Sequence, residues 1–310
     1  MELAGEPPAD AVVGPGDDAA AWRGSASGLV LWSTDTICEN VDFRRRHQTP
    51  YQVGWKAWMA AVSDLSAMGA TPRGGLVAAL VPEETSTEAL HAIQLGLVEA
   101  AAVDGALVMG GDLSRTPGPL ALTVTVGGEI TDGSPVILGG GSAGDRIVVT
   151  GALGMAAAAL QLLEEGSDRI PQDWLDRLLV PPSRVETGKA LRRAGVSAMT
   201  DLSDGLLLDL ARICQESGVG ADLWLDRLPL GRGLEDTGRA TELALTGGED
   251  FELLATIPES LVGGITRSWK GGLPPLAVVG RLTIPGGTHL FREQGGDPID
   301  APAAHGFRHF

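Results

Sequence analysis

The chain has 310 residues, of which 40 are acidic and 23 are basic, so its formal net charge at neutral pH is −17. A surface this negative repels nucleic-acid phosphates and anionic lipid head groups, and we therefore expect neither nucleic acid nor a membrane as a partner. The apolar fraction of 44% is high enough for a folded core, and the length favours about two domains.

The N-terminal region and the cysteines give a prediction of location. Residues 1–10 lack the basic start and apolar stretch of a secretory signal peptide, and no apolar run approaches the ~18 residues that span a membrane. Cys38 and Cys214 match no metal-binding spacing and fit a reducing compartment. We therefore expect a soluble cytoplasmic protein.

The first half of the chain alternates strand-like and helix-like segments. Residues 29–33 are an apolar run that stops at the polar cluster 33–36, which predicts a buried strand feeding a loop. Apolar residues then recur at three- and four-residue intervals over 51–68, which predicts an amphipathic helix. By the same criteria we expect strands at 75–81, 106–109 and 120–126, and a helix that runs from the capping residue Ser86 to Val103.

A domain boundary is predicted where the composition changes to Gly, Pro and Ser, between Thr131 and Gly144. We place an N-terminal domain at residues 1–137 and a C-terminal domain at 138–310. In the second domain we expect strands at 146–150, 221–225 and 251–257 and helices at 155–163, 183–194 and 204–217. Alternation in both halves predicts an α/β or α+β class with two domains of similar size.

The common nucleotide-binding and zinc-binding motifs do not explain how this protein functions. A Walker P-loop sequence is absent, and none of the five histidines has zinc-ligand spacing. Residues 139–144 match G-x-G-x-x-G, but they precede a predicted strand, whereas a dinucleotide fingerprint follows one. We interpret this stretch as a linker between domains.

A series of acidic motifs is the most informative feature of the sequence. The carboxylates are expected where strands or helices end, each beside Gly, Ser or Thr. The motifs are Gly16-Asp17-Asp18, Ser33-Thr34-Asp35-Thr36, Ser63-Asp64, Gly110-Gly111-Asp112, Asp201-Leu202-Ser203-Asp204-Gly205 and Gly247-Gly248-Glu249-Asp250. One such motif alone is typical of a turn or helix cap. If the loops converge, the carboxylates need protons or cations, and hard oxygen ligands select Mg²⁺, Mn²⁺ or Ca²⁺.

Taken in order, these motifs resemble those of the thiamine-monophosphate kinases, a family of the aminoimidazole ribonucleotide synthetase-like superfamily. The most specific are Ser63-Asp64-Leu65-Ser66-Ala67-Met68-Gly69-Ala70 and Gly247-Gly248-Glu249-Asp250-Phe251-Glu252-Leu253. The resemblance runs from residue 16 to 253, and Gly306-Phe307 is similar to the family's C-terminal substrate segment. It implies the two-domain fold of that superfamily and a homodimer that pairs the N-terminal sheets.

The resemblance also implies an activity, which is ATP-dependent phosphorylation of thiamine monophosphate to thiamine diphosphate by direct transfer with several Mg²⁺ ions. Asp35, Asp64 and Asp112 would be the catalytic residues. The implied metal ligands are Asp18, Ser33, Thr34, Asp35, Asp64, Asp112, Asp201 and Asp204. Gly111, Asp112 and Ser203 would contact ATP, whereas Glu249 and Phe307 would contact the thiamine moiety. Because a phosphate monoester has a second pKa of about 6, the acceptor needs no general base.

Two positions depart from the family pattern. Asp42 stands where the family has a substrate-contacting histidine, so it either faces the acceptor or only turns the loop before Arg44. Leu138 aligns with an ATP-binding arginine, and Arg146 or Arg115 are the candidates to replace it. Two alternatives therefore stay open. One is another ATP-dependent synthetase of the superfamily, and the other is a non-catalytic, acidic cation-binding protein.

Overall fold

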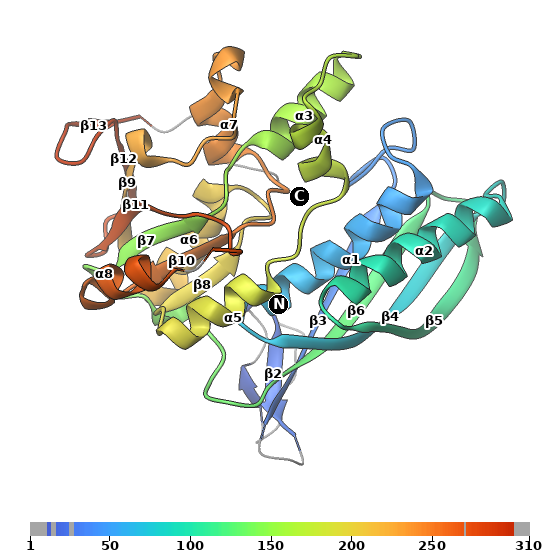
Figure 1. The fold of residues 1–310 in the computed structure, drawn as a ribbon, viewed down its shortest axis with the longest axis horizontal. Coiled ribbons are helices and arrows are strands. Elements are labelled where there is room, and N and C mark those ends of the chain that lie inside the picture. Colours follow the sequence, from blue (N-terminus) through green and yellow to red (C-terminus); the bar gives the residue numbers. More distant parts are fainter. Residues whose placement is uncertain (1–10, 14–16, 25–27, 270, 301–310) are drawn as a thin grey trace. The chain divides into compact units, whose positions relative to one another are not determined.

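The computed structural model describes residues 11–13, 17–24, 28–269 and 271–300 (Figure 1). The chain divides into two compact units, one of Met1–Pro135 with Leu179–Val185 and the other of Val136–Leu178 with Glu186–Phe310. The break thus follows residue 135, where the sequence predicted 137. Leu179–Val185 returns to the first unit because Val185 is part of its core and the Trp55 indole donates to the main-chain oxygen of Pro181 at 3.0 Å.

The first unit contains a six-stranded sheet of order β1-β2-β3-β6-β4-β5. All neighbouring strands are antiparallel except β4 and β5, which are parallel because a helix, α2, connects them. The strands are β1 (Ala11–Val13), β2 (Ala20–Arg23), β3 (Leu29–Cys38), β4 (Thr71–Pro82), β5 (Leu107–Thr116) and β6 (Ala121–Ile130).

Helices α1 (Pro50–Ala67) and α2 (Thr87–Val103) lie side by side over this sheet (Figure 1). Both begin as the sequence predicts, since Thr49 forms a capping box with Gln52, and the Ser86 hydroxyl accepts from the N–H of Ala89. Their buried residues form one core with the inward side chains of the sheet, among them Trp58, Leu65 and Val124. The second face of the sheet carries no helix of the first unit among the described residues.

Four predicted strand ends in the first unit were wrong. β4 begins at Thr71 and not at residue 75, and β6 ends at Ile130 and not at residue 126. β3 continues through the polar cluster 33–36 to Cys38, because β6 pairs with it along its whole length. β5 likewise continues through Gly110-Gly111-Asp112 to Thr116, paired with β4. Asp35 and Asp112 therefore lie within strands, where side chains alternate between the two faces, and not in loops at their ends.

The second unit contains a seven-stranded sheet of order β13-β12-β9-β11-β7-β10-β8, antiparallel except for the β9–β12 pair. Six helices accompany it among the described residues. The strands are β7 (Arg146–Thr150), β8 (Ala198–Asp201), β9 (Gly220–Trp224), β10 (Leu253–Ile257), β11 (Leu276–Thr283), β12 (Thr288–Phe291) and β13 (Pro298–Ile299). The helices are α3 (Met155–Glu164), α4 (Gln172–Leu179), α5 (Val185–Ala194), α6 (Leu206–Ser217), α7 (Ala240–Thr246) and α8 (Glu259–Ser268).

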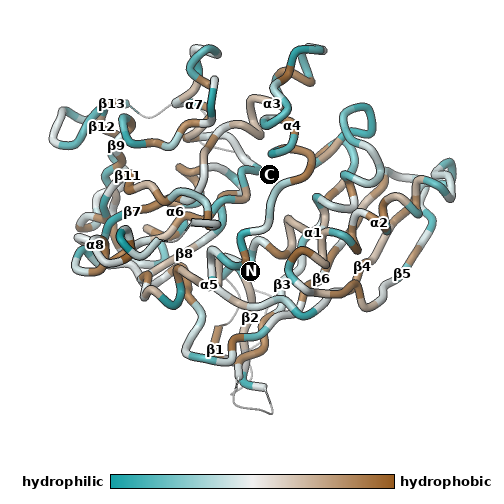
Figure 2. The backbone as a smooth tube through the Cα atoms, viewed as in Figure 1, coloured by the Kyte–Doolittle hydropathy of each residue, from teal (hydrophilic) through white to brown (hydrophobic). Residues whose placement is uncertain are grey.

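The core of the second unit lies between α6 and one face of this sheet, where Leu210 and Ile213 pack with Ile147, Val149 and Leu254. In each unit the hydrophobic colour of Figure 2 follows mainly the strands and helices, while the hydrophilic colour gathers in the connecting loops. The mixed and largely antiparallel sheets make the fold α+β. Within the described ranges, the helices are all too short or too polar to cross a membrane.

The packing of α1 on α2 requires glycine on both helices. A Cβ at Gly54 would lie 2.0 Å from the main-chain oxygen of Ile93, and one at Gly96 would lie 2.0 Å from that of Tyr51. Gly264, in contrast, lies within α8 with nothing within 4 Å of a Cβ. The two helices therefore approach to backbone contact, and only glycine permits this.

We predict opposite effects of alanine at these two kinds of helical glycine. Gly54→Ala should destabilise the first unit by about 1–3 kcal/mol, because the helices must move apart. Gly264→Ala should stabilise the second unit by up to about 1 kcal/mol through helix propensity. Scanning calorimetry of both variants tests this, and a stabilised Gly54→Ala protein would contradict the close helix approach.

Candidate functional site

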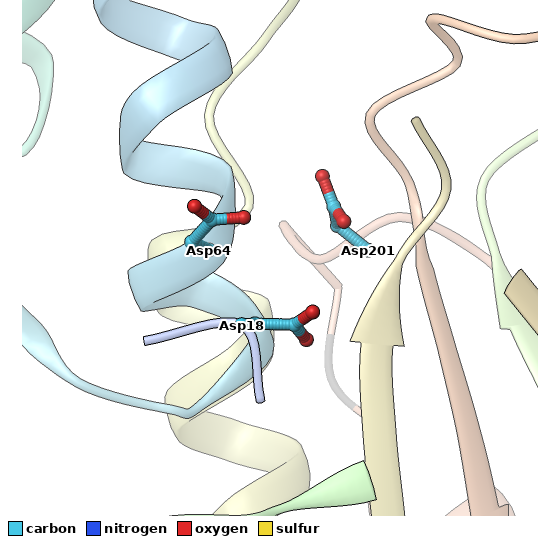
Figure 3. A group of neighbouring side chains, drawn as sticks. All are labelled: Asp18, Asp64 and Asp201. Carbon is cyan, nitrogen blue, oxygen red and sulfur yellow. The ribbon is translucent and has the colours of Figure 1, made fainter. Parts of the chain in front are cut away.

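In the first unit, three of the predicted metal ligands lie together. The Ser33 hydroxyl of β3 donates to the carboxylate of Asp64 in α1, and it lies 3.3 Å from the main-chain oxygen of Asp18. Carboxylate oxygens of Asp18 and Asp64 lie within 4.8 Å of each other. Figure 3 shows Asp64 on its helix, Asp18 on the loop before β2 and, from the second unit, Asp201 at the end of β8.

The pairing of the strands explains why this group forms at Ser33. β2 pairs only with residues 29–32 of β3, whereas β6 pairs with all of β3 on its other side. Among the described residues, no strand flanks β3 beyond Trp32 on the β2 side. The Asp17-Asp18 turn, in which the N–H of Asp18 donates to the Asp17 carboxylate at 2.9 Å, therefore approaches Ser33.

Alternation along β3 separates the other predicted ligands. Ser33 and Asp35 share a face with the buried Leu31 and Ile37, which is the face covered by the helices. Thr34 and Thr36 lie on the opposite face, where their hydroxyls form hydrogen bonds of 2.9 and 2.8 Å with Thr125 and Thr123 of β6. Because the Thr34 side chain is on the face away from Asp64, Thr34 would bind a metal ion beside Asp64 through its own main-chain oxygen.

Asp112 lies away from this group, three strands along the sheet in β5. It is paired with Ala78, which is paired with Thr123, which is paired with Thr36, so all four share the face opposite the helices. The preceding residue, Gly111, has to be glycine, because a Cβ there would lie 1.8 Å from the main-chain oxygen of Val77. The predicted nucleotide-binding Gly111 and Asp112 thus form a second, separate place on the first unit.

In the second unit, β8 ends at Asp201 and the loop 202–205 leads into α6. The Ser203 hydroxyl lies 3.4 Å from an Asp201 carboxylate oxygen. Asp209 of α6 holds this loop, because its carboxylate accepts hydrogen bonds from the N–H groups of Asp204 and Gly205 at 3.2 and 3.1 Å. Asp201, Ser203 and Asp204 are therefore presented together at one end of this sheet.

The pKa of Asp209 reflects both its burial and the negative charge of this loop. Its side chain is fully buried, and burial, followed by the charges of Asp201 and Asp204, raises its pKa to about 8. The Arg212 guanidinium, 3.8 Å from its carboxylate, opposes the rise in pKa. Because two neighbouring carboxylates contribute to this raised pKa, the loop is negative and a cation would be favourable there.

The predicted acceptor residues are distributed differently. Glu249 is half-buried, and its N–H donates to the main-chain oxygen of Ser203 at 2.9 Å. Asp42 forms a turn, because its carboxylate accepts from the N–H of Cys38 at 2.7 Å, and its main-chain oxygen accepts from the buried Lys56 ammonium at 2.9 Å. Phe307 lies outside the described residues.

The two candidate replacements for the missing arginine both have partners. Arg146 donates to Glu259 and lies over the Trp224 ring at 5.5 Å, while Arg115 pairs with Glu83 at 3.4 Å. Leu138 is buried in the core of the second unit. In this structure both candidate arginines are thus paired with a glutamate.

The donors in both units are carboxylate, hydroxyl and main-chain oxygens. Such hard oxygen donors fit Mg²⁺, which binds few protein carboxylates and keeps several waters when it carries phosphate substrates. The sequence assigned no role to Asp209, and it included Asp250 in an acidic motif without giving it a role of its own. Asp209 could have been found from its place in the first turn of a predicted helix directly after an acidic loop.

Comparison with known proteins gives consistent matches. Residues 16–130 match the model of the AIR synthase related protein N-terminal domain, and residues 142–291 match that of its C-terminal domain. Thiamine-monophosphate kinase of Rhodopirellula baltica is 36% identical over 96% of this chain and 91% of its own length. That of Bacillus subtilis is 34% identical over 79% of this chain and 77% of its own length.

Solved structures agree with these sequence matches. The structure described as AaThiL complexed with AMPPCP and TMP is 29% identical, with a TM-score of 0.84 over 95% of this chain and 91% of its own. Thiamine-monophosphate kinase from Stenotrophomonas maltophilia K279a is 33% identical with a TM-score of 0.79, and the two chains cover 92% of each other. The hydrogenase maturation protein HypE, at 19% identity and a TM-score of 0.76, shares the fold.

We predict that the stability of the metal-free protein falls as the pH rises. Burial raises the pKa of Asp250 from 3.8 to about 7, against the opposing hydrogen bond from Gly154. Between these values the folded state keeps a proton that the unfolded state has released, so the unfolding free energy decreases by up to about 1.4 kcal/mol per pH unit. Urea unfolding in EDTA from pH 4 to 8 measures this slope.

Asp250→Asn provides the control for this pH dependence. It removes the titrating group, so its unfolding free energy should decline less steeply with pH than that of the wild type. Asp209, whose pKa is also raised, contributes in the same direction in both proteins. Parallel slopes for the two proteins would show that Asp250 does not titrate in this range.

Proposed function

The chain belongs to the thiamine-monophosphate kinase family, and we propose that it transfers the γ-phosphoryl group of ATP to thiamine monophosphate, forming thiamine diphosphate. The observation that carries the proposal is the similarity to these kinases over 96% of the chain. The grouping of Asp18, Ser33 and Asp64 supports it, since phosphoryl transfer depends on oxygen ligands for metal ions. Both cysteines are free, which suits a cytoplasmic location.

We assign several Mg²⁺ ions to the oxygen donors of each unit. In the first unit they would be held by Asp18, Ser33, Thr34, Asp35, Asp64 and Asp112, and in the second by Asp201 and Asp204. When bound, they supply positive charge that offsets the repulsion between two polyanionic substrates. Gly111 and Asp112 would bind ATP together with Ser203, and Glu249, with Phe307, would bind the thiamine moiety.

This chemistry asks little proton transfer of the protein. The acceptor phosphate is mostly dianionic at neutral pH, so the protein needs to orient it and not to deprotonate it. Asp42 does not have to serve as a base, and its carboxylate is engaged with the N–H of Cys38. The contribution of the chain is therefore positioning, for which rigid strands and a closely packed helix are suited.

A product assay tests the proposed function. Protein incubated with ATP, Mg²⁺ and thiamine monophosphate should form thiamine diphosphate and ADP in equal amounts, and EDTA should stop the reaction. ATP hydrolysis that depends on a different acceptor would favour another synthetase of the superfamily. Binding of metal without any ATP turnover would favour the non-catalytic alternative.

Asp64→Asn should lower kcat by at least about a hundredfold, because it removes one negative ligand while leaving the helix unchanged. Asn can still accept the Ser33 hydrogen bond, and a smaller negative charge beside Asp18 relieves repulsion, so the melting temperature should not fall. Steady-state kinetics and calorimetry on the same preparation test both expectations. Activity close to that of the wild type would remove Asp64 from the proposed site.

We further propose that the active form is a homodimer in which Asp112 serves the site of the partner subunit. Two strands, β6 and β4, lie between β3 and β5, which separates Asp112 from the Ser33 group by roughly 14 Å at the usual strand spacing. Asp112 also shares the face opposite the helices, whereas Ser33 and Asp64 are on the helix side. Within one chain, these ligands are too far apart to bind the same phosphates.

The face that carries Asp112 also has the composition of an interface. Leu76 and Leu80 of β4 are about half exposed there, and the hydroxyls of Thr34 and Thr36 lie on the same face in β3, on the other side of β6. A sheet face that combines exposed leucines with paired threonines is suited to covering by a second sheet. A symmetric dimer would place two copies of this face together.

Complementation tests the shared site. Asp64→Asn and Asp112→Asn should each be inactive alone, but a mixture refolded or co-expressed at equal amounts should recover about a quarter of wild-type activity. Half of the dimers are then mixed, and one of the two sites in each mixed dimer has both aspartates intact. A mixture that stays inactive although mixed dimers form would show that both residues act within one chain.

A further inference from the structure

The loop that carries Glu249 has an unusual backbone. Among the described residues, φ is positive at three non-glycine residues, and two of them, Glu249 at 65° and Phe251 at 45°, flank Asp250. Side chains with a Cβ disfavour this left-handed region, and a bulky residue such as Phe disfavours it strongly. The loop therefore keeps this conformation only because its surroundings impose it.

Main-chain hydrogen bonds attach this loop to the Asp201–Asp204 loop. The N–H groups of Glu249 and Phe251 each donate at 2.9 Å, to the main-chain oxygens of Ser203 and Leu202 respectively. The N–H of Leu202 donates in return to the main-chain oxygen of Glu252 at 2.8 Å. The conformation of Glu249 is thus coupled to the backbone of the proposed metal and nucleotide residues.

Asp250 anchors the loop on its other side. Its side chain is buried, and its two carboxylate oxygens lie 3.1 and 2.9 Å from the N–H of Gly154, the residue that caps α3. Gly154 has no side chain to cap this helix, so the carboxylate from 96 residues away does so. Moving Asp250 would leave a buried helix end without its acceptor.

The next two side chains are fixed as well. Phe251 is buried, and the fully buried Glu252 accepts from the Thr150 hydroxyl and from Arg177, each at 2.7 Å. A Cβ at Gly151 would lie 1.9 Å from a Glu252 carboxylate oxygen. Residues 250–252 therefore point inward and are held, and Glu249 is the acidic side chain of this loop that remains partly exposed.

We propose that Asp250 is a positioning residue for the acceptor, which fixes Glu249 in its left-handed conformation by anchoring the loop to the first turn of α3. The proposal rests on the proposed role of Glu249 in binding the thiamine moiety. Asp250 itself is buried and does not contact the substrate. Its effect on the reaction should pass through Glu249.

A double-mutant cycle tests this route. Asp250→Ala and Glu249→Ala should each raise KM for thiamine monophosphate about tenfold, while KM for ATP changes by less than about twofold. The double variant should have a KM for thiamine monophosphate no higher than that of the more impaired single variant. Without the Glu249 carboxylate, Asp250 has no side chain left to position. Asp250→Asn, which keeps one acceptor oxygen, should fall between wild type and Asp250→Ala. Multiplicative effects in the cycle would overturn the proposal.

Hydrogen exchange gives a second readout that does not depend on turnover. In Asp250→Ala the amides of Glu249 and Phe251 should exchange at least about tenfold faster, because the loop is released. Should that variant not fold, Asp250→Asn, which keeps one acceptor oxygen, should show a smaller increase at the same amides. Unchanged exchange at these amides would overturn the proposal. A wild type that does not use thiamine monophosphate would instead refute the proposed function, and the exchange experiment would still decide the anchoring role.

Ser86→Ala is the matched control for lost stability. It removes the side-chain cap of α2 without touching the second unit. It should lower the melting temperature while leaving both KM values and the exchange at Glu249 and Phe251 unchanged. If Ser86→Ala raises KM for thiamine monophosphate as Asp250→Ala does, the effect of Asp250 is general destabilisation and the proposal fails.

Discussion

Repulsion between carboxylates is the constraint on which the local structure of both units depends. Two unit charges 4.8 Å apart repel by about 3.5 kcal/mol at an effective dielectric constant of 20, and Asp18 and Asp64 are at least this close. A chain that brings such carboxylates together must hold them in place by other interactions before a cation binds. The hydrogen bond from the Ser33 hydroxyl to Asp64 and the close packing of α1 on α2 do this in the first unit.

The second unit uses buried acids for the same purpose. Asp209 and Asp250 have pKa values raised to about 8 and 7 by burial, and both accept hydrogen bonds from main-chain N–H groups next to functional loops. A carboxyl with a pKa raised this far can accept these bonds while adding less than a full negative charge to an already negative region. The acidic residues Asp201, Asp204 and Glu249 are thus held in place by two buried acids, Asp209 and Asp250.

Much of the fold could be predicted from the sequence because periodicity and caps are local properties. The helix at 51–68 and the Ser86 cap agree with the structure within a residue, and so does the strand at 146–150. The ends of β3 and β5 could not be predicted, because polar residues such as Asp35 and Asp112 stay in a strand when a neighbouring strand pairs with them. The anchoring contacts of Asp209 and Asp250 could not be predicted, because their partners, Gly205 and Gly154, are brought to them only by the fold.

The same strand pairing changes what the acidic motifs mean. When they are taken as loop ends, all the aspartates can be imagined in one pocket of one chain. Once Asp35 and Asp112 lie within strands of one sheet, alternation assigns each side chain to a face, and register fixes how far apart they are. The side chains of Ser33 and Asp35 face the helices, whereas those of Thr34 and Asp112 face away. Because all four residues are in paired strands, a loop movement cannot bring these side chains together. If Asp112 and Ser33 serve the same site, as we propose, a second copy of the sheet has to supply one of them. The alternation of side chains along a β-strand thus connects the proposed chemistry to the proposed dimer.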